Sequence, residues 1–146
     1  MEKIEGFQKE FRWLSNFWPA TVEFEGIVYP SSEHAYQAAK TDNQDLRKMI
    51  RDLASPGEAK RFGKKVAFRP GWEAMKLDVM ERIIREKFKN PALAKQLRAT
   101  WPAELIEKNH WRDHFWGVCQ GVGHNHLGKI LMKVRDELLT SESQKV

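Results

Sequence analysis

The residues best placed for chemistry are a glutamate and a lysine on one predicted helix. Glu33 and Lys40 are seven positions apart, nearly two helical turns, so they share a face of that helix with Tyr36 and Gln37. A carboxylate and an amine that converge on one site can divide acid, base and electrostatic roles, and a lysine can attack an anomeric carbon to form a Schiff base. The alternative is the polar face of an ordinary surface helix.

A second group of reactive side chains lies between residues 110 and 138. It combines the acid Asp113 with Trp111, Trp116 and a glycine-rich turn that runs into a helix capped at Asn125. Free N–H groups at the start of such a helix can bind a phosphate or a ribose oxygen. The turn is neither a Walker loop nor a Rossmann fingerprint, because it lacks Gly-Lys-Ser/Thr and a preceding parallel strand.

The same segment holds four of the five histidines, so a zinc site has to be considered. His110 and His114 would share a helical face near Cys119. Bulky residues interrupt this set, and no His-Glu-x-x-His pattern supplies a general base. We therefore expect no metal and no cofactor, and we expect Cys119 to be a small packed residue rather than a nucleophile.

Composition narrows the class of protein. The 146 residues include 25 Lys and Arg, 20 Asp and Glu, and a single cysteine, which excludes a disulfide framework and a multi-cysteine metal site. The length fits one domain. No apolar run approaches the roughly 20 residues that cross a bilayer, and the N-terminus lacks the apolar region of a secretory signal. We expect a cytoplasmic protein with no membrane partner; the sequence leaves its oligomeric state open.

The net charge of +5 is unevenly distributed. Residues 1–33 carry six acids and three bases, whereas residues 47–98 carry fifteen bases and six acids, a net of +9. Such a block can attract the phosphate of a nucleotide, a sugar phosphate or a nucleic acid. The alternative is that these lysines and arginines occupy the solvated faces of amphipathic helices.

The pattern of residues predicts a single compact α+β domain over residues 1–146, mainly helical, with a small antiparallel sheet. The first thirty residues read as extended, and Glu25-Gly26 is typical of a two-residue hairpin turn between two alternating segments, 22–24 and 27–29. Helices are expected after a cap at Ser31 or Ser32 through Lys40, over about 42–53, from Ser55-Pro56 to Gly63, over about 72–88, over 91–99 and from Asn125 through Leu138, with a short strand at Leu105-Ile106. The core is expected over about 7–139, and residues 140–146 are expected to fray.

Three blocks of the sequence resemble the NADAR (YbiA-like) family of N-glycosidases and ADP-ribosylguanine hydrolases. They are FRWLSNFWPATVEFEGIVYPSSEHAYQAAK over 11–40, SPGEAKRFGKKV over 55–66 with WEAMKLDVMERIIREKF over 72–88, and a final block with Asp113, Trp116-Gly117, Gly121, the run from Asn125 to Met132, and Arg135. The resemblance implies cleavage of the C–N bond between a phospho- or ADP-ribose and a base or amine. Two substrate classes follow from it: ADP-ribose on guanine in nucleic acid, and phosphoribosylamino-pyrimidine intermediates of riboflavin biosynthesis.

The resemblance also implies a set of site residues. Glu33 would stabilise an oxocarbenium-like sugar, Lys40 would act as a nucleophile on a ring-opened sugar or as a cation near phosphate, and Asp113 would serve as a second acid/base group or orient sugar hydroxyls. Substrate contacts are expected from Arg12, Ser15, Asn16, Phe17, Tyr36, Trp72, Trp116, Gly117, Asn125 and Gly128, with Phe17 and Trp116 stacking on the base. The sequence departs from the family pattern at Cys119-Gln120, His124 and His126. These departures affect the details of substrate contact that the resemblance implies.

A competing hypothesis is a non-catalytic module that binds ADP-ribose or nucleic acid through the same aromatic, glycine-rich and basic features. It predicts tight binding without release of a base. A purely structural protein does not explain why polar residues lie inside the aromatic runs. The partner expected first is a small ribosyl or ADP-ribosyl molecule; the basic block adds ADP-ribosylated DNA or RNA as a further candidate.

Overall fold

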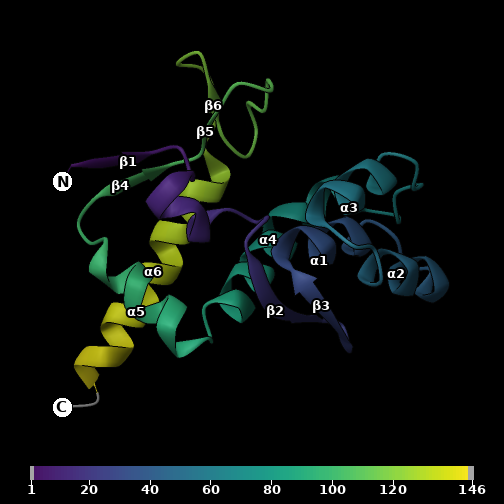
Figure 1. Ribbon diagram of the computed structural model, residues 1–146, viewed down its shortest axis with the longest axis horizontal. Helices are drawn as coiled ribbons and strands as arrows, with labels where there is room; N and C mark the ends of the chain where they lie inside the picture. The colour runs from purple at the N-terminus through teal and green to yellow at the C-terminus, as the bar shows by residue number, and fades with distance from the viewer. Residues whose placement is uncertain (1, 145–146) are drawn as a thin grey trace. The chain divides into compact units, whose positions relative to one another are not determined.

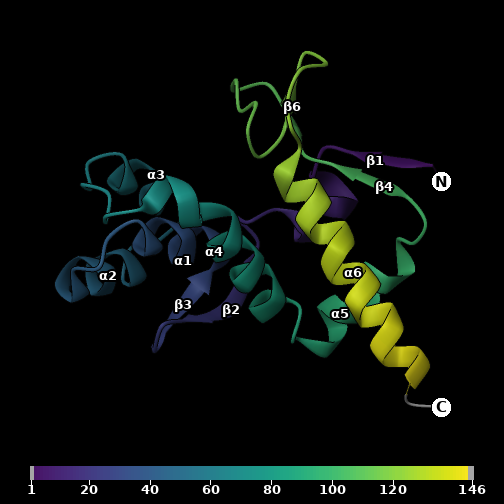
Figure 2. The ribbon, with the colours of Figure 1, turned by 180° about the vertical axis from the view of Figure 1, so that it is seen from behind.

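The computed structural model describes residues 2–144, which form two compact units (Figures 1 and 2). Unit 1 contains the residues up to Ser15 and those from Phe88 onward, and unit 2 runs from Asn16 to Lys87. The elements in chain order are β1 (Lys3–Glu5), the 3-10 helix η1 (Lys9–Leu14), β2 (Pro19–Phe24), β3 (Ile27–Ser31), α1 (Ser32–Ala39), α2 (Gln44–Arg51), α3 (Pro56–Gly63), α4 (Trp72–Lys87), α5 (Pro91–Ala99), β4 (Glu104–Ile106), β5 (Lys108–Asn109), β6 (Val118–Cys119) and α6 (His126–Gln144). This is the expected mainly helical α+β class. No helix within residues 2–144 has the length and apolar character needed to cross a membrane.

The antiparallel hairpin of unit 2 forms where the sequence predicts it. β2 and β3 pair with Phe24 opposite Ile27. The turn between them has positive φ at both central residues, 46° at Glu25 and 88° at Gly26, as a two-residue type I′ hairpin turn requires. The hairpin delivers the chain directly into α1.

Helix α1 is the central element of unit 2. Ser31 caps it, since its Oγ accepts the N–H of His34 at 3.1 Å. Every residue from Ser32 to Ala39 is buried, and the helix contacts β2, β3, α2, α3 and α4 (Figure 1). The surface-helix alternative is therefore wrong, and the polar residues of α1 must find their partners inside the protein.

The other predicted helix starts are confirmed by their caps. The side chains of Asn43, Ser55 and Asn90 accept the N–H groups of Leu46, Glu58 and Leu93, at the starts of α2, α3 and α5 respectively. Proline occupies the first position of α3 and of α5, where its missing N–H has no partner to lose.

Unit 1 contains pairings that the sequence did not predict. β1 pairs with β4 in parallel, and β5 pairs with β6 in parallel, in segments of only two or three residues. The expectation that the first thirty residues are extended is wrong over Lys9–Leu14, which form η1. In the same unit α6 packs on α5 and on β4. A Cβ at Gly128 would lie 2.1 Å from the Leu105 carbonyl oxygen, so α6 approaches β4 this closely only with glycine there.

Helix α6 is longer than expected. The segment expected to fray from residue 140 is helical as far as Gln144, and residues 145–146 lie outside the described chain. No glycine or proline occurs between Lys129 and Gln144 to end the helix earlier.

Candidate functional site

Glu33 is a buried acid of unit 2, at the start of α1. Its side chain is 7% exposed, and its Oε1 accepts a hydrogen bond from Gln37 Nε2, one turn later on α1, at 3.1 Å. The N–H of Glu33 donates to the carbonyl oxygen of Asn16 at 3.0 Å, which ties the segment before β2 to the start of α1. These contacts hold the Glu33 carboxylate at a fixed position inside the protein.

Three polar atoms beside Glu33 are buried and make no hydrogen bond within the described residues. They are Asn16 Oδ1, Ser32 Oγ and Gln37 Oε1, on residues that adjoin or contact Glu33. Folded proteins leave few buried polar groups unsatisfied, so a cluster of them needs an explanation. Each of the three atoms is covered by the protein itself, and Gln37 Oε1 lies against Gly63 of α3.

The Lys40 amine lies at the other end of α1, among aromatic rings. Its Nζ is 5.4 Å from the centroid of the Tyr36 ring and 5.7 Å from that of Phe68. The Trp72 ring, at the start of α4, lies 5.5 Å from Tyr36 and 6.3 Å from Phe68. Tyr36 and Trp72 were predicted site residues and Phe68 was not, because it lies in the loop before α4, where no periodic pattern singles it out.

Burial lowers the pKa of the Lys40 amine below its ordinary value of 10.5. The Glu33 carboxylate acts in the opposite direction, and the positive charges of Lys76, Lys60 and Lys64 lower the pKa further. The net shift is downward, so a larger fraction of Lys40 is the neutral amine near neutral pH. A neutral, partly desolvated lysine amine is the form that attacks carbon.

Six of the predicted site residues belong to unit 2: Asn16, Phe17, Glu33, Tyr36, Lys40 and Trp72. The structure brings Asn16 against Glu33 and brings Trp72 against Tyr36, close to Lys40. Phe17 follows Asn16 directly and is 43% exposed. Gln37 joins the site as the hydrogen-bond partner of Glu33, as its position one turn along α1 allows.

The remaining predicted residues belong to unit 1: Arg12, Ser15, Asp113, Trp116, Gly117, Asn125 and Gly128. Asp113 shapes the loop that carries it, since its Oδ1 accepts the N–H groups of Phe115 at 3.1 Å and Trp116 at 2.8 Å. A Cβ at Gly117 would lie 1.8 Å from Glu107 Oε2, so this glycine serves close packing.

Asn125 stands directly before α6, but its side chain does not cap that helix. Its Oδ1 accepts the N–H of Glu107 and its Nδ2 donates to the carbonyl oxygen of Leu105, both at 2.9 Å, so the amide joins the chain before α6 to the β4 region. The N–H groups of His126 and Leu127 donate to carbonyl oxygens of the preceding loop. The first backbone N–H groups of α6 are thus already hydrogen-bonded within the protein. The expectation that the Asn125 side chain caps α6 is wrong.

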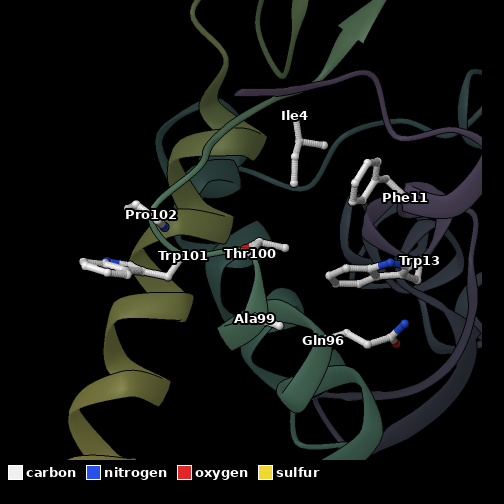
Figure 3. Close-up of a pocket in the computed structure, with 8 residues that line it drawn as sticks. All are labelled: Ile4, Phe11, Trp13, Gln96, Ala99, Thr100, Trp101 and Pro102. Atoms are coloured by element: carbon white, nitrogen blue, oxygen red, sulfur yellow. The ribbon is translucent and has the colours of Figure 1, made fainter. Parts of the chain in front are cut away.

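Unit 1 also contains an apolar cavity of about 320 Å³ (Figure 3). Its lining residues are Ile4, Phe11, Trp13, Gln96, Ala99, Thr100, Trp101 and Pro102, and none of these carries an ionisable side chain. Phe11 and Trp13 face Thr100 and Ala99 across it in Figure 3. Such a lining can hold an apolar group but offers no acid or base. A second pocket of unit 1, of about 440 Å³, does have ionisable side chains in its lining, among them Glu5, Glu104 and Lys129.

Among residues 2–144, no group of three or more His, Cys, Asp or Glu side chains is placed to hold a metal ion.

Comparisons with known proteins agree with the resemblance seen in the sequence. The profile of the NADAR domain matches residues 5–139. A riboflavin biosynthesis protein of Vibrio vulnificus is 42% identical over 130 residues, which cover 86% of this chain but 35% of that protein, so the chain spans about a third of it. The N-glycosidase YbiA of Escherichia coli K12 is 40% identical over 131 residues, covering 86% of this chain and 80% of YbiA.

The solution structure of E. coli YbiA superimposes with a TM-score of 0.86 at 34% sequence identity, covering 97% of this chain and 87% of that one. The match therefore extends over sequence and fold together. The chain belongs to the NADAR domain family.

Proposed function

We propose that this protein is an N-glycosidase that hydrolyses the C–N bond between a ribose-type sugar and a base or amine. The observation that carries the proposal is the buried helix α1, which holds the Glu33 carboxylate through Gln37 and places the Lys40 amine among aromatic rings. The similarity to proteins named N-glycosidase supports the reaction type. We also propose that residues 7–139 act as one functional domain, since the family match runs over 5–139.

Glu33 is proposed to act at the anomeric carbon. Loss of the base leaves positive charge on the sugar, and a fixed carboxylate in a water-poor setting stabilises that charge strongly. Gln37 holds one oxygen of the Glu33 carboxylate by donating to it, so the carboxylate keeps its place while the substrate reacts. When the Lys40 amine adds to C1, the Glu33 carboxylate is proposed to take the proton that Nζ gives up and to pass it to the departing nitrogen.

Lys40 is proposed to be the nucleophile toward the ring-opened form of the substrate, in which C1 is an imine carbon bonded to the departing nitrogen. The neutral Nζ adds to C1, a proton passes to the departing nitrogen, and the C1–N bond breaks. The sugar is then held on Lys40 as a Schiff base. One water hydrolyses it, releasing the sugar and restoring the amine, so the net reaction consumes one water.

The substrate class is proposed from the chemistry of the chain and the names of its relatives. Phosphoribosylamino-pyrimidines are supported by the similarity to proteins of riboflavin biosynthesis. ADP-ribose attached to guanine in DNA or RNA is supported by the net charge of +9 over residues 47–98. Asp113 is proposed to act by shaping the loop that carries Trp116, because its Oδ1 accepts two backbone N–H groups.

The test is a parallel assay of product release from both substrates. Wild-type protein should release free base or amine from at least one of them, and Glu33→Gln should bind that substrate while turning it over at least ~100-fold more slowly. Glu73→Gln is the matched control, because Glu73 is an acid of the same unit whose side chain is 71% exposed. Tight binding without product release from the wild type would contradict the proposal and favour a binding module.

A further inference from the structure

The hairpin turn between β2 and β3 carries a carboxylate that joins two arginines. Oε1 of Glu25 lies 3.0 Å from Arg47 Nη2 and 3.2 Å from Arg69 Nη1. Arg47 belongs to α2, and Arg69 lies in the loop between α3 and α4. Three segments that are separate in the sequence therefore meet at one carboxylate oxygen. The sequence pattern indicates Glu25 only as part of a turn.

Both arginines also hold the chain at the C-terminal end of α1. The Arg47 Nε donates to the carbonyl oxygen of Thr41 at 2.7 Å, and the backbone N–H of Arg69 donates to that of Lys40 at 2.6 Å. The last carbonyl groups of a helix have no partner within the helix, so these donors satisfy them. The side chains of Arg47 and Arg69 are only 2% and 19% exposed, which shields their ion pairs with Glu25 from screening by salt.

Arg69 stands between two of the aromatic residues that surround the Lys40 amine. Phe68 precedes it directly, and its ring centroid is 5.7 Å from Lys40 Nζ. The N–H of Trp72 donates to the Arg69 carbonyl oxygen at 3.2 Å. The ion pair with Glu25 therefore fixes the loop that places Phe68 beside the amine and leads into Trp72.

A fixed backbone at this point matters for a reactive amine. Lys40 is the C-cap residue of α1, and helix ends fray unless other contacts hold them. Its amine stands on a flexible four-carbon stem, so the position of Nζ depends on the backbone and on the rings around the stem. A displacement of about 1 Å at a reacting group can slow a reaction about 100-fold.

We propose that Glu25 is a positioning residue for Lys40 and acts on it through Arg47 and Arg69. The inference rests on the proposed function and deepens it, since it names what keeps the nucleophile in place. Glu25 touches neither the amine nor the reacting atoms. It holds the two arginines, which hold the end of α1 and the loop that carries Phe68.

Amide hydrogen exchange followed by NMR tests this contact without turnover. The Arg69 N–H should exchange at least about tenfold faster in Glu25→Ala than in the wild type, while the N–H of Ala59, bonded to the Ser55 carbonyl oxygen, keeps its rate. Glu25→Asp keeps the charge at a positive φ that aspartate tolerates, so it should restore the Arg69 rate to within about threefold of the wild type. Glu23→Ala is the matched control, because Glu23 is an exposed acid of the same hairpin, and it should change neither rate.

Arg69→Met tests the same contact while leaving the buried Arg47 paired with Glu25. The amide at position 69 should again exchange about tenfold faster, and the double variant with Glu25→Ala should exchange no faster than Glu25→Ala alone. Unchanged exchange at position 69 in both single variants, or equal acceleration of the Ala59 amide, overturns the positioning role and leaves the hydrolase untouched.

The kinetics separate positioning from substrate binding. In an active enzyme, Glu25→Ala should lower kcat about tenfold and change KM less than about threefold, and Glu25→Asp should restore kcat. Wild-type kcat in Glu25→Ala, or an equal loss in Glu23→Ala, overturns the inference. If the wild type cleaves no C–N bond, the proposed function fails, and the exchange rates still show whether Glu25 holds the backbone at Lys40.

Discussion

Replacing Gly63 with alanine tests the packing that positions the Glu33 carboxylate. The added methyl group would lie 1.8 Å from Gln37 Oε1 and 2.7 Å from Gln37 Cδ, so the Gln37 side chain has to rotate away. It then loses its 3.1 Å hydrogen bond to Glu33. Loss of a hydrogen bond to a charged group lowers stability by about 1.5–3 kcal/mol, and overpacking by the added methyl group lowers it by about 1–3 kcal/mol. The higher helix propensity of alanine offsets up to about 1 kcal/mol of this loss.

We therefore expect Gly63→Ala to lower the free energy of unfolding by about 2–4 kcal/mol, measured by urea unfolding, and to lower kcat more than it changes KM. The double variant Gly63→Ala with Gln37→Ala is the control, since removing the Gln37 side chain makes room for the methyl. In that background the Gly63 substitution should cost less than about 0.5 kcal/mol. A Gly63→Ala protein with wild-type stability and kcat would refute this reasoning.

Three further predictions concern buried polar groups. Burial lowers the pKa of Lys87 from 10.5 to about 7, so between these pH values the unfolded chain carries a proton on Lys87 that the folded chain lacks. The free energy of unfolding therefore rises with pH in this window, by up to about 1.4 kcal/mol per pH unit. Denaturant titrations across the window should show this rise in the wild type and not in Lys87→Met, and equal slopes for the two proteins would contradict the prediction. Arg47 is buried and donates to the Thr41 carbonyl oxygen at 2.7 Å. Arg47→Met should therefore lower the free energy of unfolding by about 2–3 kcal/mol, measured by thermal unfolding. An unchanged melting temperature would show that the contact is dispensable. Asn125→Ala loses two hydrogen bonds and places alanine at a φ of 54°, so it should cost about 2 kcal/mol of stability in thermal unfolding; a variant of wild-type stability would contradict this structural role.

Local chemistry explains which elements the sequence predicts. Gly26 follows Glu25 between two alternating segments, and Ser31, Ser55 and Asn90 each stand where a helix needs an acceptor for its first N–H groups. These signals lie within a few residues of one another, so they can be read without knowing the fold.

The parallel pairs escape prediction because their signal is not local. β1 at Lys3–Glu5 finds its partner at Glu104–Ile106, and neither segment is long enough to show a period of two. The same limit applies to Asn125, whose position before α6 is visible in the sequence while its partners in the β4 region are not.

The residues of the candidate site also divide into those that local spacing predicts and those that depend on how separate elements pack. Glu33 and Lys40 share one predicted helix, so their common face follows from spacing, and the structure adds that this helix is buried. The place of Phe68 beside Lys40 depends on how α3, α4 and the loop between them pack on α1, which no spacing within one segment reveals.

Trapping of a covalent intermediate tests the central claim most directly. The protein is incubated with the substrate that it turns over, in the presence of borohydride, and the peptides are mapped by mass spectrometry. We predict a reduced sugar adduct on Lys40 in the wild type and no adduct or turnover in Lys40→Arg, while Lys65→Arg keeps both. Turnover without any adduct on Lys40, or wild-type turnover by Lys40→Arg, would contradict the assignment of Lys40 as the nucleophile of an N-glycosidase.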